Sequence, residues 1–285
     1  MKFLKLMIFS LVFSNVAFAV GESADVFDVS EALTNPAMNF SDYRVPNGTG
    51  VLYNNGPLIS STGTGVGGAD ESVLENTTLG MTTLGAGHTG DFRVADEFTV
   101  SGNGWDVTTI TFFAYQTNET ASTITGVNLQ IWDGVPGAPG SNVVFGDEVT
   151  NIMSSTVFSN ILRVTEATTG TANNRQIAAS TVDVNINLAP GTYWLDWQSE
   201  GSGGSGPWAP PITITGQLVT GNALQSNIGS WGDLLDGGSG SALGLPFIVE
   251  GTPVFVPPAI IPTLSQYGLL VLLLAMIVVG RRKFS

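Results

Sequence analysis

The stretch VDVNINLAPGTYWLDWQS, residues 182–199, contains the plainest strand patterns in the chain. Apolar and polar side chains alternate over residues 182–188, which gives a strand one buried face and one exposed face. The alternation resumes over residues 192–198, where Tyr, Leu and Trp take one face. Since only Ala-Pro-Gly separates the two runs, we predict that they pair as a β-hairpin.

A second stretch, ITFFAYQT at residues 110–117, is apolar on both faces. Ile110 and Phe112 would lie on one side of a strand, and Phe113 and Tyr115 on the other. This pattern indicates a central strand that is covered on both sides, or that carries aromatic rings at a binding surface.

Short β-rich runs recur from residue 49 to residue 251, separated by clusters of Gly, Pro and Asn. The last of these runs is LPFIVEG, residues 245–251, and no helical periodicity appears before the C-terminal tail. The spacing is typical of an all-β sandwich, and we predict one such domain over residues 49–251.

The charge of the chain is strongly one-sided. All 23 acidic residues lie between Glu22 and Glu250, and the only basic residues in that interval are four arginines, so its net charge is 4 − 23 = −19. Such a surface repels nucleic acid and favours divalent cations. The chain has no cysteine, which excludes disulfides, Cys-type zinc sites and Cys-attached haem.

The two ends of the chain resemble export signals. Residues 1–19 combine two lysines, a short apolar core and an Ala-x-Ala ending, which is typical of a secretory signal peptide. A polar leader, residues 20–48, would follow it. At the other end, residues 252–259 form a Pro-rich tether before an apolar run, residues 260–280.

The apolar run is just long enough to span a bilayer, at about 31 Å for about 1.5 Å per residue. A basic cluster follows it directly and would hold this end in the cytoplasm. We therefore predict one C-terminal transmembrane helix with the sandwich domain outside.

The tail, residues 260–285, also resembles the IPTL-CTERM sorting signal of Gram-negative bacteria, a relative of the PEP-CTERM signal. Its matching residues are Ile261, Pro262, Thr263, Leu264, Ser265, Tyr267, Gly268, Arg281, Arg282 and Lys283. Tyr267 stands where the family usually has Trp, and it keeps an interfacial aromatic ring. The resemblance implies processing by an exosortase-type membrane transpeptidase and delivery to the cell surface or extracellular matrix.

The runs LYNNGPL, VADEFTV, LQIWDGVPGAPGSNVVFGD and LPFIVEG, within residues 49–251, resemble a β-sandwich module of anchored bacterial surface proteins. The resemblance implies a jelly-roll or lectin-like sandwich. It implies no activity.

Nothing in the sequence singles out a catalytic centre. His88 is the only histidine and lies among glycines in GAGHTGD, so we interpret it as a loop residue rather than a catalytic one. Paired carboxylates for glycoside hydrolysis have no distinguishing spacing here. We expect no enzymatic activity.

Aromatic residues next to carboxylates suggest a site for sugars. Trp105-Asp106, Trp132-Asp133, Trp194 with Asp196, and Trp231 with Asp233 all show this combination. Exposed rings stack on sugar faces while carboxylates accept bonds from hydroxyls. Trp194, Asp196 and Trp208 are the predicted glycan-binding residues; the alternative is that these tryptophans fill the core.

Calcium is the ion that the composition favours. It prefers oxygen ligands and tolerates loop carbonyls. Asp133, Asp147 and Glu148 are the densest loop acids and the predicted ligands, although no EF-hand-like ligand run is present. The alternative is that these acids are solvated.

Together these patterns favour a non-catalytic surface or extracellular-matrix protein. The alternative is a glycan-binding module that tethers matrix polysaccharide.

Overall fold

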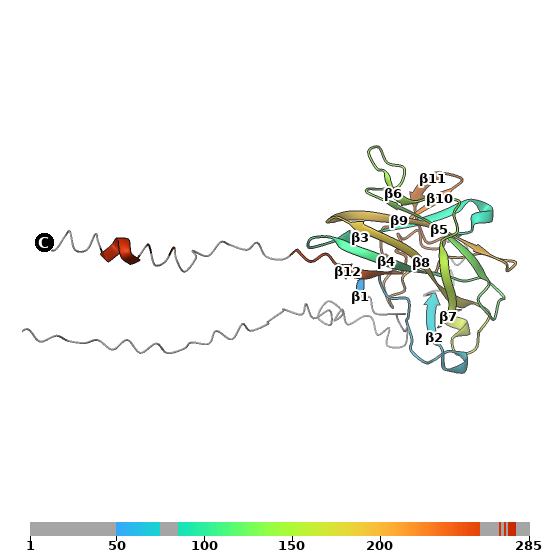
Figure 1. Ribbon diagram of the computed structural model, residues 1–285. Helices are drawn as coiled ribbons and strands as arrows, with labels where there is room; N and C mark the ends of the chain where they lie inside the picture. The colour runs from blue at the N-terminus through green and yellow to red at the C-terminus, as the bar shows by residue number, and fades with distance from the viewer. Residues whose placement is uncertain (1–49, 75–84, 257–267, 269–270, 272, 278–285) are drawn as a thin grey trace, which may run out of the picture. The chain divides into compact units, whose positions relative to one another are not determined.

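The computed structural model describes residues 50–74, 85–256, 268, 271 and 273–277 (Figure 1). The described residues form two six-stranded β-sheets, which confirms the predicted all-β sandwich. The strands are β1 (Gly50–Asn54), β2 (Asp70–Leu74), β3 (Phe92–Val100), β4 (Trp105–Ala114), β5 (Ile124–Trp132), β6 (Val143–Gly146), β7 (Met153–Thr165), β8 (Gln176–Leu188), β9 (Gly191–Gly201), β10 (Leu224–Asn227), β11 (Ser230–Asp233) and β12 (Phe247–Pro253). Three short 3-10 turns, η1 (Val66–Gly68), η2 (His88–Gly90) and η3 (Glu166–Thr168), interrupt the loops.

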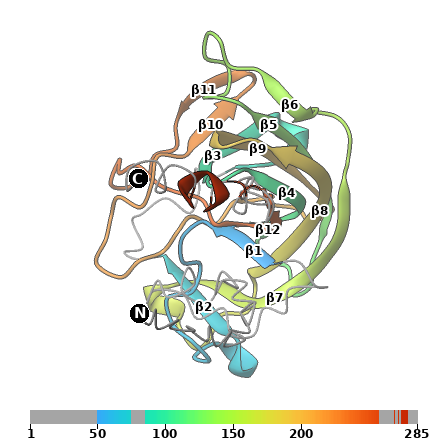
Figure 2. The same ribbon diagram turned by 60° about the vertical axis from the view of Figure 1, so that its left-hand side comes forward.

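The first sheet has the order β1-β12-β4-β8-β7-β2, and the second has the order β11-β10-β3-β9-β5-β6. Of the strand pairs in the described residues, only β2 with β7 is parallel. Most neighbours in a sheet are far apart in sequence, because the chain crosses repeatedly from one sheet to the other. Figure 2 shows β1, β12, β4 and β8 side by side, with β3, β9 and β5 beyond them.

The predicted hairpin of residues 182–188 with residues 192–198 is wrong. β8 pairs with β4 and β7 in the first sheet, whereas β9 pairs with β3 and β5 in the second. The Ala-Pro-Gly connection therefore crosses between the sheets instead of closing a turn within one. Each strand still buries one apolar face, because the two faces meet across the core rather than lying on the same sheet.

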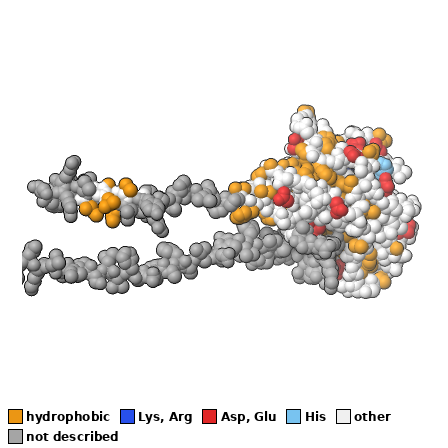
Figure 3. All heavy atoms as spheres, viewed as in Figure 1, with side chains coloured by type: hydrophobic (Ala, Val, Ile, Leu, Met, Phe, Trp, Pro, Cys, Tyr) orange, Lys and Arg blue, Asp and Glu red, His pale blue; other side chains and the backbone are white. Residues whose placement is uncertain are grey.

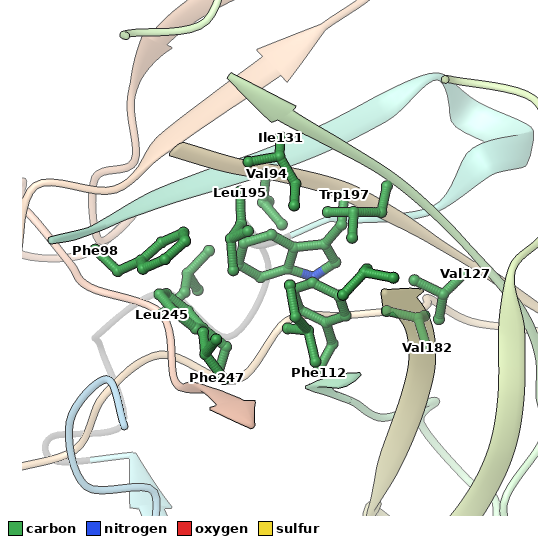
Figure 4. Close-up of a cluster of buried hydrophobic side chains, with 14 of the residues drawn as sticks. Val94, Phe98, Phe112, Val127, Ile131, Val182, Leu195, Trp197, Leu245 and Phe247 are labelled. Atoms are coloured by element: carbon green, nitrogen blue, oxygen red, sulfur yellow. The ribbon is translucent and has the colours of Figure 1, made fainter. Parts of the chain in front are cut away.

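The main core lies between the sheets around Trp197 (Figure 4). Its indole stacks on the ring of Phe112 from the opposite sheet, with centroids 4.6 Å apart, and meets Phe247 edge-on at 6.2 Å. Phe98 extends the aromatic contacts towards Tyr193 and Trp105. Offset and edge-on aromatic pairs of this kind add to the stabilisation from apolar burial.

The strand β4 is covered on both faces, as its sequence predicted. Ile110 and Phe112 belong to the main core, while Phe113 and Tyr115 pack in a second apolar cluster with Leu58. This second cluster lies on the outer face of the first sheet. The loops that follow β1 and β9 supply its covering side chains, including Trp208.

The last strand, β12, ends at Pro253, two residues into the predicted tether. In the part of the chain that the structure describes, no helix is long and apolar enough to cross a membrane. The predicted signal peptide and leader lie outside the described residues. So does most of the predicted span, of which residues 268, 271 and 273–277 are described and helical.

Candidate functional site

The outer face of the second sheet collects most of the side chains that the sequence marked for binding. Along β9, Trp194, Asp196 and Gln198 alternate with Leu195 and Trp197, whose side chains enter the main core. Because of this alternation, the side chains of Trp194, Asp196 and Gln198 lie on the outer face of the second sheet. Trp132 of β5 lies directly opposite Trp194 in the strand register.

At the centre of this face, Arg93 and Asp196 form a buried ion pair. The Nε of Arg93 donates to Oδ1 of Asp196 at 2.6 Å, and its Nη1 donates to Oε1 of Gln198 at 3.0 Å. The indole N–H of Trp132 donates to the other carboxylate oxygen of Asp196 at 3.1 Å. The pair joins β3 and β9 through side chains that water barely reaches, and the partly exposed Trp132 connects it to β5.

The electrostatics of this pair are dominated by burial. Removal from water raises the pKa of Asp196 to about 6, while the charge of Arg93 and the hydrogen bonds from Arg93 and Trp132 oppose the rise. Breaking such a pair costs more than forming it stabilises, because one charge is left unpaired. We therefore interpret the pair as a clamp between strands.

A third tryptophan lies on the same face. Trp231 of β11 is opposite Ser226 of β10, which in turn is opposite Arg93 of β3. The β5–β6 loop comes close to the Trp231 ring, since a Cβ at Gly137 would lie 3.1 Å from its Cδ1. Trp132 and Trp231 are partly exposed, so two tryptophan rings on this face reach solvent.

The face also carries buried polar oxygens that the described part of the chain leaves without a hydrogen-bond partner. They are Oδ1 of Asn128, Oε1 of Gln130 and Oγ of Ser226. Asn128 uses its amide nitrogen to donate to the carbonyl of Glu148 at 2.7 Å. Unpartnered buried acceptors are costly in a folded protein, so this face retains capacity for hydrogen bonds.

His88 begins η2, in a loop as expected, and borders the same face. Its Nδ1 lies 3.1 Å from Oε1 of Gln198, the atom that also accepts from Arg93, and its Nε2 lies 3.9 Å from Oε1 of Glu200. The side chains of His88 and Glu200 are 40% and 39% exposed. The contacts join η2 to β9.

The predicted glycan-binding residues do not form one exposed site. Trp194 is 5% exposed and Asp196 is 1% exposed, so the expectation that they face solvent is corrected by the structure. Asp196 is buried in its ion pair with Arg93, and Trp194 lies between β3 and β5, opposite Glu97 and Trp132. Trp208 instead packs against the second apolar cluster, and its backbone pairs with Tyr115.

Two of the three predicted calcium ligands, Asp133 and Asp147, accept hydrogen bonds within their own turns. Asp133 accepts from the backbone N–H of Asn142 at 2.6 Å, and Asp147 accepts from the N–H groups of Val149 and Thr150 at 2.8 and 2.6 Å. These bonds lower the pKa of Asp147. The side chains of Asp133, Asp147 and Glu148 are not brought together: among the described residues no group of three or more His, Asp or Glu side chains is placed to hold a metal ion.

Sequence reasoning missed the central role of Arg93. The sequence did contain a relevant pattern, because arginine is scarce in the domain and Arg93 lies in the strand-like run FRVADEFTV. In a strand, Arg93 and its neighbour Val94 point to opposite faces of the sheet. The convergence of Trp132, Trp194 and Trp231 depends on pairing between distant strands and has no local signal.

Comparison with protein-family models, with curated proteins and with solved structures finds no match to this chain.

Proposed function

We propose that the chain is a non-catalytic, exported surface or matrix protein of a Gram-negative bacterium, sorted by an exosortase-type transpeptidase. The order of its segments carries the proposal: a signal-like start, a β-rich domain without lysine, and a tail with the IPTL-like residues, an apolar run and a basic cluster. A β-sandwich over the middle segment is compatible with display outside the cell without disulfides.

The strand order supports the finer assignment as a jelly roll. In that fold two four-stranded sheets face each other, and most connections cross between them. The sets β1-β12-β4-β8 and β3-β9-β5-β6 reproduce this arrangement, with β2, β7, β10 and β11 as additions. Jelly rolls are common among lectin domains, which gives the lectin-like interpretation its support.

The buried carboxylates support the non-catalytic interpretation, because they hold segments together. Asp96 accepts from Asn55 at 2.9 Å and from the backbone N–H of Leu245 at 2.8 Å. Glu71 accepts from Gly170 and Thr64, both at 2.7 Å. A carboxylate whose oxygens all accept such hydrogen bonds has a structural role rather than that of a general acid or base.

Export is tested by adding protease to spheroplasts that express the full chain. We expect the sandwich to be degraded, and a variant lacking residues 1–19 to be protected in the cytoplasm. A cytoplasmic marker protein in the same sample reports leakage. Protection of the unaltered chain while a known periplasmic protein is degraded would refute the topology.

Processing of the tail is tested by mass spectrometry of surface material. We expect chains that end before residue 285, and we expect Pro262→Ala with Thr263→Ala to abolish the cut while leaving the apolar run intact. Chains that all end at Ser285 would contradict processing.

A second candidate, retention of polysaccharide, is favoured by the partly exposed Trp132 and Trp231 on the outer face of the second sheet. Trp231→Ala should release the protein from matrix polysaccharide, since stacking on a sugar face is lost. Phe158→Ala is the matched control, because Phe158 is an exposed aromatic residue on the other sheet. Unchanged retention of a folded Trp231→Ala variant would remove this candidate.

A further inference from the structure

The outer face of the first sheet holds a buried arginine in an environment quite unlike that of Arg93. Arg163 lies on β7, opposite Ser72 of the parallel neighbour β2, and is 1% exposed. Its Nη1 donates to Oγ of Ser72 at 2.7 Å. The Tyr115 hydroxyl is the other hydrogen-bonding group next to the guanidinium.

No carboxylate of the described residues pairs with Arg163. The ion pairs found in that part of the chain join Arg93 to Asp196 and His88 to Glu200. The Nε–H of Arg163 is also buried without a hydrogen-bond partner there. An isolated buried charge costs several kcal/mol, and a bound counter-ion is one way in which proteins offset that cost.

The local charge around Arg163 is positive. Burial lowers the pKa of the Arg163 guanidinium, and the nearby Arg175 lowers it further, while Tyr115 opposes both. The pKa of Tyr115 is raised, mainly by burial. Arginine nevertheless keeps its proton in proteins, so the site holds a cation for which the described residues supply no paired anion.

Arg163 lines a small pocket with a cavity volume of about 30 Å³. Apolar side chains form half of the lining; they are Val73, Pro211, Ile212, Ile214, Leu218 and Leu243. The other half is polar and comprises Arg163, Thr213, Gln217, Thr220, Asp236 and Ser239. The one acid in the lining, Asp236, is occupied by its own turn, where it accepts from the N–H groups of Gly238 and Ser239 at 2.9 and 2.7 Å. The pocket thus combines a cation that has no carboxylate partner among the described residues with a lining that is half apolar.

We propose that this pocket binds a small carboxylate anion, of the size of formate or acetate, through the guanidinium of Arg163. The guanidinium fork matches the two oxygens of a carboxylate. The apolar side chains of the lining accommodate the hydrogen or methyl of these anions, and the small volume of about 30 Å³ favours them over the larger phosphate and sulfate. The site is separate from the tryptophan face and does not depend on the proposed surface function.

The test compares thermal unfolding of the purified full chain in sodium formate, sodium acetate, sodium phosphate and sodium chloride at matched ionic strength. We expect a saturable rise in Tm with the two carboxylates, of roughly 5–10 °C at 100 times Kd. Arg163→Met should lose that rise. Arg175→Met, the matched control at a partly exposed arginine, should keep it.

A direct binding measurement covers the case in which Arg163→Met does not fold. The ¹³C line of labelled acetate should broaden on addition of the unaltered protein and sharpen again with excess unlabelled formate. Equal Tm shifts in all four salts, a rise that Arg163→Met retains, or an acetate line that does not broaden would each overturn the proposal. A rise in phosphate alone would overturn the carboxylate assignment.

Discussion

Single residues in this sandwich hold buried charge in three ways. Arg93 is paired with Asp196, Asp96 is surrounded by N–H donors, and Arg163 has no carboxylate partner among the described residues. In all three cases the charged side chain makes some hydrogen bonds, but only in the Arg93–Asp196 pair is its charge neutralised by an opposite charge. Substitutions at these positions should therefore differ in sign and in pH dependence.

Arg93→Met should destabilise the domain by about 3–5 kcal/mol at neutral pH, because it leaves Asp196 buried and unpaired. The loss should shrink near pH 5, where Asp196 takes up a proton. Urea unfolding measures both effects. The double variant Arg93→Met with Asp196→Leu should regain most of the loss, and a single-variant loss below about 1 kcal/mol would contradict the role of the pair.

The stability of the domain should increase as the pH falls from about 7.5 to about 5. Burial raises the pKa of Asp96 from 3.8 to about 6, although N–H groups of Asn55, Glu97 and Leu245 oppose the rise. The folded state therefore binds more protons than the unfolded state between these two pKa values, which contributes about 1–1.5 kcal/mol in favour of folding by pH 5.

The urea midpoint measured across this pH range checks the sign. Asp147, whose pKa is lowered, acts only below its ordinary value of 3.8 and so outside the window. Asp96→Asn should reduce the slope of the pH profile, and Asp196, whose pKa is also raised to about 6, should supply the slope that remains. A midpoint that falls steadily from pH 7.5 to pH 5 would show the prediction to be wrong.

At the scale of elements, the β5–β6 hairpin depends on glycines for two different reasons. Gly146 has φ +77° and packs against the backbone of β5, so a Cβ there would collide with the carbonyl oxygen of Leu129. Gly140, in the loop of the same hairpin, has φ +88°, but a Cβ there would have no atom within 4 Å. Comparing substitutions at Gly140 and Gly146 therefore distinguishes the cost of backbone strain from the cost of steric overlap.

We expect Gly140→Ala to cost about 1–2 kcal/mol, since only the left-handed conformation is penalised. Gly146→Ala should cost at least ~3 kcal/mol, because the collision with β5 adds to the strain and opens the hairpin. Urea unfolding of the two variants compares them directly. Equal losses would mean that the packing of β6 on β5 contributes nothing.

At the scale of the whole molecule, the acidic excess is spread over the surface. Figure 3 shows acidic side chains dispersed over one face, on which no Lys or Arg side chain of the described residues is visible. Since Asp133 and Asp147 are engaged in their own turns, we expect calcium and sodium chloride at matched ionic strength to raise Tm equally, through screening alone. A saturable additional rise in calcium, lost in Asp147→Asn, would contradict this and restore the calcium site.

Much of the architecture was predictable because burial imposes periodicity on each strand. The alternation of residues 182–188 and the two apolar faces of β4 were predicted correctly. The candidate site was less predictable. Trp194 and Asp196 were placed on the correct strand face, but both are buried there, which no local pattern records.

The sequence by itself determined which residues form strands and which face of each strand is apolar, because those properties follow from the period of two along the chain. Only the tertiary structure decided which strands pair, whether a polar face is open to water, and which cation meets which anion. The sequence patterns of β8 and β9 suited a hairpin within one sheet as well as a crossing between two. Packing of both apolar faces into one core selects the crossing, and the same choice buries Arg93 against Asp196 while leaving Arg163 without a carboxylate among the described residues.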